Sequence, residues 1–114
     1  MNFKHEIKDN IFLLHLSGDL LGENHGAEII SVVNDVINDG IRACIVDISQ
    51  VRYINSSGIG VLITVLTKFR NKEGEVVLLK PSENVKKLLI ITKLNSIFNI
   101  KESEEEAVQT LKNG

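Results

Sequence analysis

The sequence predicts an α/β fold: a single domain over residues 1–114, with a mostly parallel mixed sheet of four to five strands and about four helices. Short apolar runs of strand length alternate with segments whose apolar residues recur every three or four positions. This alternation is typical of parallel strands joined by right-handed helical crossovers. A chain of 114 residues can bury one core and has no room for a second. Its content of 43% hydrophobic and 25% charged residues fits a globular domain.

The first two strands are predicted at residues 3–8 and 11–20, "FKHEIK" and "IFLLHLSGDL". Apolar and polar residues roughly alternate in both segments, which indicates strands with one buried face. Residues 8–10 form the predicted turn between them. We expect this strand pair to lie near an edge of the sheet.

A helix is predicted at residues 26–40, because its apolar residues form one stripe at spacings of three and four. Gly40 is a suitable helix stop. The run "IRACIVDIS" at 41–49 is short, apolar and rich in β-branched residues, which favours a strand buried on both faces.

The second helix is predicted within residues 56–74, where Leu62, Val65, Leu66 and Phe69 share one face. The strand "EVVLLK" follows and ends before Pro81. A third helix is predicted within residues 82–98.

Three shorter features complete the predicted order. Ser82 is expected to cap the third helix at its N-terminus. Residues 99–103 are predicted as a short last strand, and residues 103–113 as a last helix. Ser103 and Glu106 have the spacing of a capping box.

Several functional classes are disfavoured by composition. The net charge is −2 and the 13 basic residues are scattered, so no nucleic-acid partner is expected. The single Cys44 excludes an internal disulfide, and its apolar surroundings predict a buried side chain. His5, His15 and His25 show no metal-ligand spacing with Cys44, so we expect neither a metal nor another cofactor.

The N-terminal segment is charged and lacks the apolar core of a signal peptide. The longest apolar runs have about nine residues, too few to cross a bilayer. A cytoplasmic protein without direct membrane insertion is therefore expected.

The stretch "DISQVRYINSSGIG" at residues 47–60 joins a predicted strand to a predicted helix. Ligands and partners tend to meet a parallel sheet at the carboxyl ends of its strands, which is where this stretch lies. Asp47 is expected at the strand's end, where it either hydrogen-bonds the following loop or serves a site. Gly58 and Gly60 allow a backbone or a partner to approach closely.

Asn55, Ser56 and Ser57 are all good helix N-cap residues, but one cap is enough. The spare hydroxyl needs another explanation. Catalysis is disfavoured, because a nucleophilic serine needs a positioned base and the histidines lie in the first 25 residues. A phosphoacceptor is favoured, because a helix N-terminus tolerates a phosphate and the added charge would change the surface that a partner meets.

Ile59 and Ile63 lie outside the apolar stripe of the second helix. Two interpretations remain open for them. They are either buried like the rest of an apolar helix, or exposed beside Ser56 as an apolar anchor for a partner.

The run "VDISQVRYINSSGIGVLITVLTKFRNKEGEVVLL" closely resembles the STAS domain of bacterial anti-sigma factor antagonists. The similarity continues to residue 111 and extends more loosely back to "LSGDL", so it covers nearly the whole chain. In that family the first serine of a D-S-S-G-x-G motif is phosphorylated by a partner anti-sigma factor that is also a kinase. The unphosphorylated form binds this anti-sigma factor and frees a sigma factor, and a PP2C-type phosphatase removes the phosphate.

The resemblance implies that Ser56 is the phosphorylated residue of a non-enzymatic binding module. It matches Asp47, Asn55, Ser56, Ser57 and Gly58 to the motif region of the family. We expect these residues to bind the partner, together with Ile59 and Ile63, which the helix pattern suggests as an apolar anchor. The chain departs from the family at Asn55, which replaces the usual Asp, and at Leu21, where the family tends to carry an Asp.

Two alternatives remain beside this interpretation. One is a STAS-type module of a stress-sensing or transporter-associated assembly that is not regulated by its own phosphorylation. The other is an enzyme or small-ligand binder that uses the cleft at the carboxyl ends of the strands.

Overall fold

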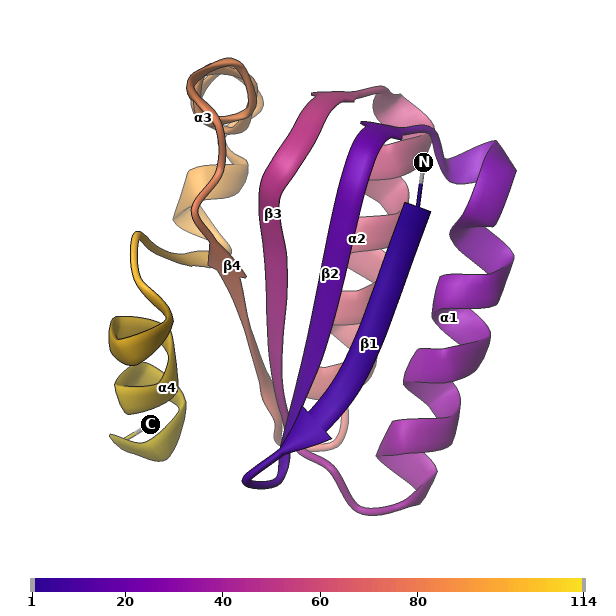
Figure 1. Cartoon of the computed structure of the whole chain (residues 1–114), viewed down its shortest axis with the longest axis vertical. Helices are drawn as coiled ribbons and strands as arrows, with labels where there is room; N and C mark the ends of the chain where they lie inside the picture. The colour runs from indigo at the N-terminus through magenta and orange to yellow at the C-terminus, as the bar shows by residue number, and fades with distance from the viewer. Residues whose placement is uncertain (1, 114) are drawn as a thin grey trace.

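The computed structural model describes residues 2–113 as five strands and four α-helices around one mixed sheet (Figure 1). The strands follow the order β1-β2-β3-β4-β5 across the sheet, with only β1 antiparallel to its neighbour. The predicted α/β class and order of elements are confirmed. The elements are β1 (Asn2–Lys8), β2 (Ile11–Leu20), α1 (Gly22–Asn38), β3 (Ala43–Ile54), α2 (Ser56–Arg70), β4 (Glu75–Leu79), α3 (Glu83–Ile91), a 3₁₀ turn (Leu94–Ser96), β5 (Asn99–Lys101) and α4 (Glu104–Asn113).

The β1–β2 hairpin closes through a two-residue turn at Asp9 and Asn10, which have φ values of 54° and 64°. Positive φ at both positions is the signature of a type I′ turn, whose twist matches that of the flanking strands. Asp and Asn tolerate this left-handed backbone better than other residues with a Cβ. The turn places Lys8 opposite Ile11 and fixes the register along the whole hairpin.

The main core lies between one face of the sheet and the helices α1, α2 and α3. Alternate residues of the strands point into it, including Phe12 and Leu14 of β2 and Val46 of β3. A smaller core lies on the opposite face, where α4 covers Ile11 and its neighbours. Figure 1 shows α4 beside β4, apart from α1 and α2.

Strand β3 is longer than the sequence predicted. The expected strand ended at Ser49, but β3 continues to Ile54 because its pairing with β2 persists after its pairing with β4 ends at Asp47. Two register shifts against β2 insert an extra β3 residue each. Such bulges break the alternation of apolar and polar residues, so the second half of the strand lacked a strand pattern in the sequence.

Two helix boundaries also differ from their predictions. Helix α1 begins at Gly22, before the predicted Gly26. Helix α3 ends at Ile91, because Lys93 adopts a left-handed conformation with φ of 62° and separates the helix from the following 3₁₀ turn. The apolar pattern runs through this break, since Leu94 beyond it is also buried.

Cys44 is fully buried in the main core, as its apolar surroundings predicted. Burial disfavours the thiolate and raises the pKa of this thiol well above its ordinary range. Within residues 2–113, every helix is too short or too polar to cross a membrane.

Candidate functional site

The junction between β3 and α2 is capped by Asn55. Its side-chain Oδ1 accepts a hydrogen bond of 2.8 Å from the backbone N–H of Gly58, and its backbone N–H donates to the carbonyl of Leu20 at 3.3 Å. Asn55 has an extended backbone, with φ of −93° and ψ of 179°, which is the usual geometry of an N-cap. The cap is therefore supplied by the residue that precedes both serines.

Ser56 and Ser57 form the exposed first turn of α2. Within residues 2–113, no hydrogen bond involves their hydroxyls or their backbone N–H groups. These N–H groups are among the unsatisfied donors at a helix start, and the helix dipole adds a partial positive charge there. The first turn carries no acidic side chain. The site is therefore prepared for an anion and lacks one of its own.

Gly58 is buried at the point where α2 crosses the end of β2. A Cβ atom at this position would overlap the backbone carbonyl oxygen of Leu20 and lie 3.0 Å from Cγ2 of Ile54. The same carbonyl accepts a hydrogen bond from the Asn55 N–H, and this bond holds it close to Gly58. Gly58 does allow a close backbone approach, and the group that approaches is the chain's own β2.

Ile59 and Ile63 are both half-buried and pack against the main core. Neither of the two open interpretations holds in full, since each side chain is covered in part and accessible in part. Their neighbour Val61 is buried, and Gly26 of α1 lies so close that a Cβ there would meet Val61 Cγ2 at 3.0 Å.

Asp47 was expected at the end of its strand. It lies instead in the middle of β3. Its carboxylate accepts hydrogen bonds from His15 Nδ1 and from the Ser49 backbone N–H, both at 3.0 Å. Its side chain shares the sheet face of Ile45, which α4 covers further along. Ile54 lies seven positions further along the strand, a span of roughly 20 Å. The structure brings Asn55, Ser56 and Ser57 together and leaves Asp47 apart.

Two side chains near the junction were missed by the sequence interpretation. Arg52 forms a two-pronged ion pair with Asp19 of β2, with distances of 3.0 and 3.1 Å. The hydrogen bond from Arg52 lowers the pKa of the Asp19 carboxyl. Tyr53, two residues before Asn55, is 55% exposed. No local sequence pattern predicted the Arg52–Asp19 pair. Its two residues are 33 positions apart and meet only through the bulged register of β2 and β3.

A family model described as the STAS domain matches residues 2–107. The chain belongs to the STAS domain family. A relative from Thermotoga maritima that is named as an anti-sigma factor antagonist is 26% identical over 110 residues, covering 96% of this chain and 97% of the relative.

Solved STAS structures share the same architecture. The crystal structure of a Thermotoga maritima protein that is named as an anti-sigma factor antagonist matches with a TM-score of 0.87 and 26% identity, over 96% of this chain and 94% of that one. Bacillus SpoIIAA in its phosphorylated form matches with a TM-score of 0.74 and 22% identity, over 96% of this chain and 98% of that one. This last likeness is one of fold.

The hydrogen bonds from His15 and Ser49 to Asp47 imply that the stability of this STAS domain depends on pH. Partial burial disfavours the charged carboxylate, but the hydrogen bonds from Ser49 and His15 outweigh burial and lower the pKa of Asp47. A carboxyl whose pKa is lowered by folding stabilises the native state above its unfolded pKa, near 3.9, and loses this contribution as the pH falls through its folded pKa. We expect Asp47→Asn to lower the free energy of unfolding at pH 7 and to have little effect near pH 2.

Urea denaturation of both chains across this pH range measures the difference. The variant His15→Leu is the graded control, because it removes one hydrogen bond and leaves that of Ser49 in place. An Asp47→Asn deficit that stays constant from pH 7 to pH 2 would contradict the explanation.

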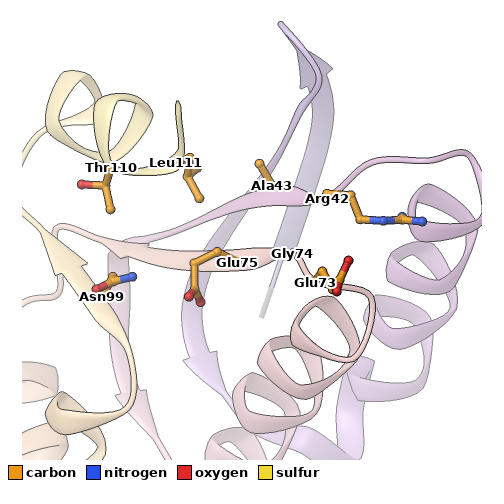
Figure 2. Close-up of a pocket in the computed structure, with 8 residues that line it drawn as sticks. All are labelled: Arg42, Ala43, Glu73, Gly74, Glu75, Asn99, Thr110 and Leu111. Atoms are coloured by element: carbon orange, nitrogen blue, oxygen red, sulfur yellow. The ribbon is translucent and has the colours of Figure 1, made fainter. Parts of the chain in front are cut away.

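A hollow of about 320 Å³ lies at the other end of the sheet, where β3, β4 and β5 begin (Figure 2). Two of its three charged side chains, Arg42 and Glu75, are already engaged. Arg42 donates to the carbonyls of Ile37 and Ile41, and Glu75 accepts from Arg70. This end of the STAS domain therefore resembles a structural junction more than a ligand site. Among the described residues, no group of three or more His, Cys, Asp or Glu side chains is placed to hold a metal.

Proposed function

We propose that this STAS domain is an anti-sigma factor antagonist that is switched by phosphorylation of Ser56. In the unphosphorylated form it binds a kinase-type anti-sigma factor in the cytoplasm and thereby frees a sigma factor. Phosphorylation of Ser56 by that partner ends the binding, and a PP2C-type phosphatase restores it. The chain itself acts as a binding module and performs no catalysis.

The observation that carries this proposal is that Asn55, and not Ser56, caps the N-terminus of α2. Asn55 supplies the cap, so the hydroxyl of Ser56 is exposed and has no structural task among the described contacts. A phosphate on Ser56 would lie beside unsatisfied N–H groups at the positive end of the helix. The fold would tolerate the modification, while the surface would gain about −1.5 to −2 charges at pH 7.

The proposed contact surface surrounds Ser56. Ser57 and the exposed ring of Tyr53 flank it, and the accessible parts of Ile59 and Ile63 add apolar area along α2. Asn55 and Gly58 hold the backbone of this surface in place. A rim of polar groups around apolar and aromatic side chains is the usual anatomy of a protein interface.

The relatives support the proposal at a coarser level. The Thermotoga relative carries the name of an anti-sigma factor antagonist, and SpoIIAA has been solved in unphosphorylated and phosphorylated forms. The chain matches the two SpoIIAA forms with TM-scores of 0.75 and 0.74, so a phosphorylated state is compatible with this fold.

Intact-mass spectrometry tests the switch. The chain is incubated with ATP and with a kinase-type anti-sigma factor captured by pull-down. We expect the addition of one phosphate, its loss in Ser56→Ala, and its retention in the matched control Ser57→Ala. Both variants change an exposed first-turn serine, so a difference between them assigns the hydroxyl.

Stable binding without phosphate transfer would contradict the switch and favour a STAS module that is not regulated by its own phosphorylation. The variant Asn55→Asp separates two causes of that result. Asp keeps the cap and restores the residue usual in the motif. Transfer that appears only in Asn55→Asp would show that the departure at this position disables phosphorylation.

A further inference from the structure

Strand β1 forms an open edge of the sheet. It pairs only with β2, and six of its seven residues are exposed, with Phe3 half-buried. Ile7 is 49% exposed although it lies on the same sheet face as the main core. The opposite edge, β5, has only three residues. An uncovered strand of this length presents unpaired backbone groups to any chain that can add a strand.

The hairpin register determines which backbone groups of β1 point outward. The two-residue turn makes Lys8 and Ile11 a hydrogen-bonded pair, since the carbonyl before such a turn accepts the N–H after it. Hydrogen-bonded and non-hydrogen-bonded pairs alternate along an antiparallel ladder. The even-numbered residues of β1 therefore bond to β2, and Phe3, His5 and Ile7 direct their N–H and C=O groups to the open side.

A second copy of the same strand fits this edge best in one register. An antiparallel pair of β1 strands centred on His5 aligns the outward-facing groups of Phe3 with those of Ile7 in the second copy. His5 then faces His5, and all seven residues of each strand are paired. A register centred on Lys4 or Glu6 also aligns outward-facing groups, but it pairs fewer residues and places Lys4 opposite Lys4 or Glu6 opposite Glu6, which is unfavourable.

The side chains in this register are self-complementary. Lys4 lies opposite Glu6 of the second copy, and symmetry repeats the pair. Both residues occupy non-hydrogen-bonded positions, where the two Cα atoms are about 4.5 Å apart and side chains interact most closely. On the other sheet face, Phe3 lies opposite Ile7, so that two apolar side chains cover each other.

We propose that this STAS domain forms a twofold-symmetric dimer by antiparallel pairing of β1 with β1 of a second copy, in the register centred on His5. Two five-stranded sheets then become continuous across the axis. The self-complementary charges select this partner. Charged residues on an edge strand discourage pairing with unrelated strands, whereas here Lys4 and Glu6 find opposite charges in their own copy.

The dimer leaves the Ser56 surface accessible. Ser56 follows the carboxyl end of β3, and the antiparallel arrangement points the two β3 strands in opposite directions. The two copies of the serine therefore lie at opposite ends of the joined sheet. The dimer does not depend on the function proposed above, and failure of either idea leaves the other standing.

Sedimentation equilibrium of the full chain, from micromolar to millimolar concentration, tests the dimer. We expect Lys4→Glu to raise the dimer dissociation constant at least about tenfold, because two attractive cross-strand pairs become repulsive. The double variant Lys4→Glu/Glu6→Lys restores opposite charges across the axis, so its dissociation constant should return to within about threefold of the original. The matched control Lys8→Glu makes the same charge change opposite Asn2, where no charged partner is affected.

Amide hydrogen exchange locates the contact. The N–H groups of Phe3, His5 and Ile7 should become protected as concentration rises, whereas those of Lys4 and Glu6 are bonded within the hairpin at every concentration. A chain that remains monomeric at millimolar concentration would overturn the proposal. A dimer that the single charge change leaves intact, or that the double variant fails to restore, would also overturn it, because its contact would lie elsewhere.

Discussion

The Ser56→Asp variant is expected to bind a kinase-type anti-sigma factor at least about a hundredfold more weakly than the unmodified chain, while keeping its fold. A carboxylate without a partner in a desolvated interface costs about 2–5 kcal/mol, which corresponds to this loss of affinity. The fold should persist, because an acidic side chain in the first turn of α2 interacts favourably with the helix dipole. Titration calorimetry gives the affinity, and urea denaturation gives the stability.

The control for this variant is Ser31→Asp, which places the same charge on an exposed position of α1. We expect it to bind the partner normally, as should Ser56→Ala, which cannot be phosphorylated. If Ser56→Asp bound as tightly as the unmodified chain, the partner would not contact this turn. Equal losses in the Ser31 and Ser56 variants would indicate a general effect of charge and not a switch.

The Gly58→Ala variant is expected to lose about 2–3 kcal/mol of stability, the cost of forcing an extra group into a packed site. The added methyl would overlap the Leu20 carbonyl oxygen. This oxygen belongs to the backbone and holds the N–H of Asn55, so it cannot move without loosening the N-cap. The free energy of unfolding from urea denaturation measures the loss.

Gly60→Ala is the matched control, two residues further along α2. A Cβ at Gly60 meets nothing within 4 Å, so this variant keeps its packing and gains helix propensity. We expect it to be unchanged or up to about 1 kcal/mol more stable. Similar stabilities for the two alanine variants would show that the close approach of α2 to β2 is not a constraint.

Apolar periodicity was enough to predict the elements and their order. The spacing in α1 and α2 placed the buried stripes correctly, and the run at residues 75–80 predicted β4. Periodicity failed where β3 is bulged, because an extra residue shifts the alternation on which a strand prediction depends. Long-range pairs such as His15 with Asp47 left no signal, since only the fold brings β2 and β3 together.

The candidate site was predicted in its location and not in its detail. Three adjacent residues had side chains suited to the N-cap, and local sequence could not choose among them. The structure has Asn55 in this role because the Leu20 carbonyl binds its N–H and holds it in the extended conformation. The consequence is that both serines, and not one of them, are released from capping.

The buried thiol of Cys44 has a practical consequence for spectroscopy. It is the only cysteine of the chain, it is fully enclosed in the core, and burial keeps it in the unreactive protonated form. A cysteine introduced at the exposed Ser57 would therefore be the sole thiol that a maleimide dye reaches in the native state. Site-specific fluorescence labelling therefore does not require removal of Cys44 first.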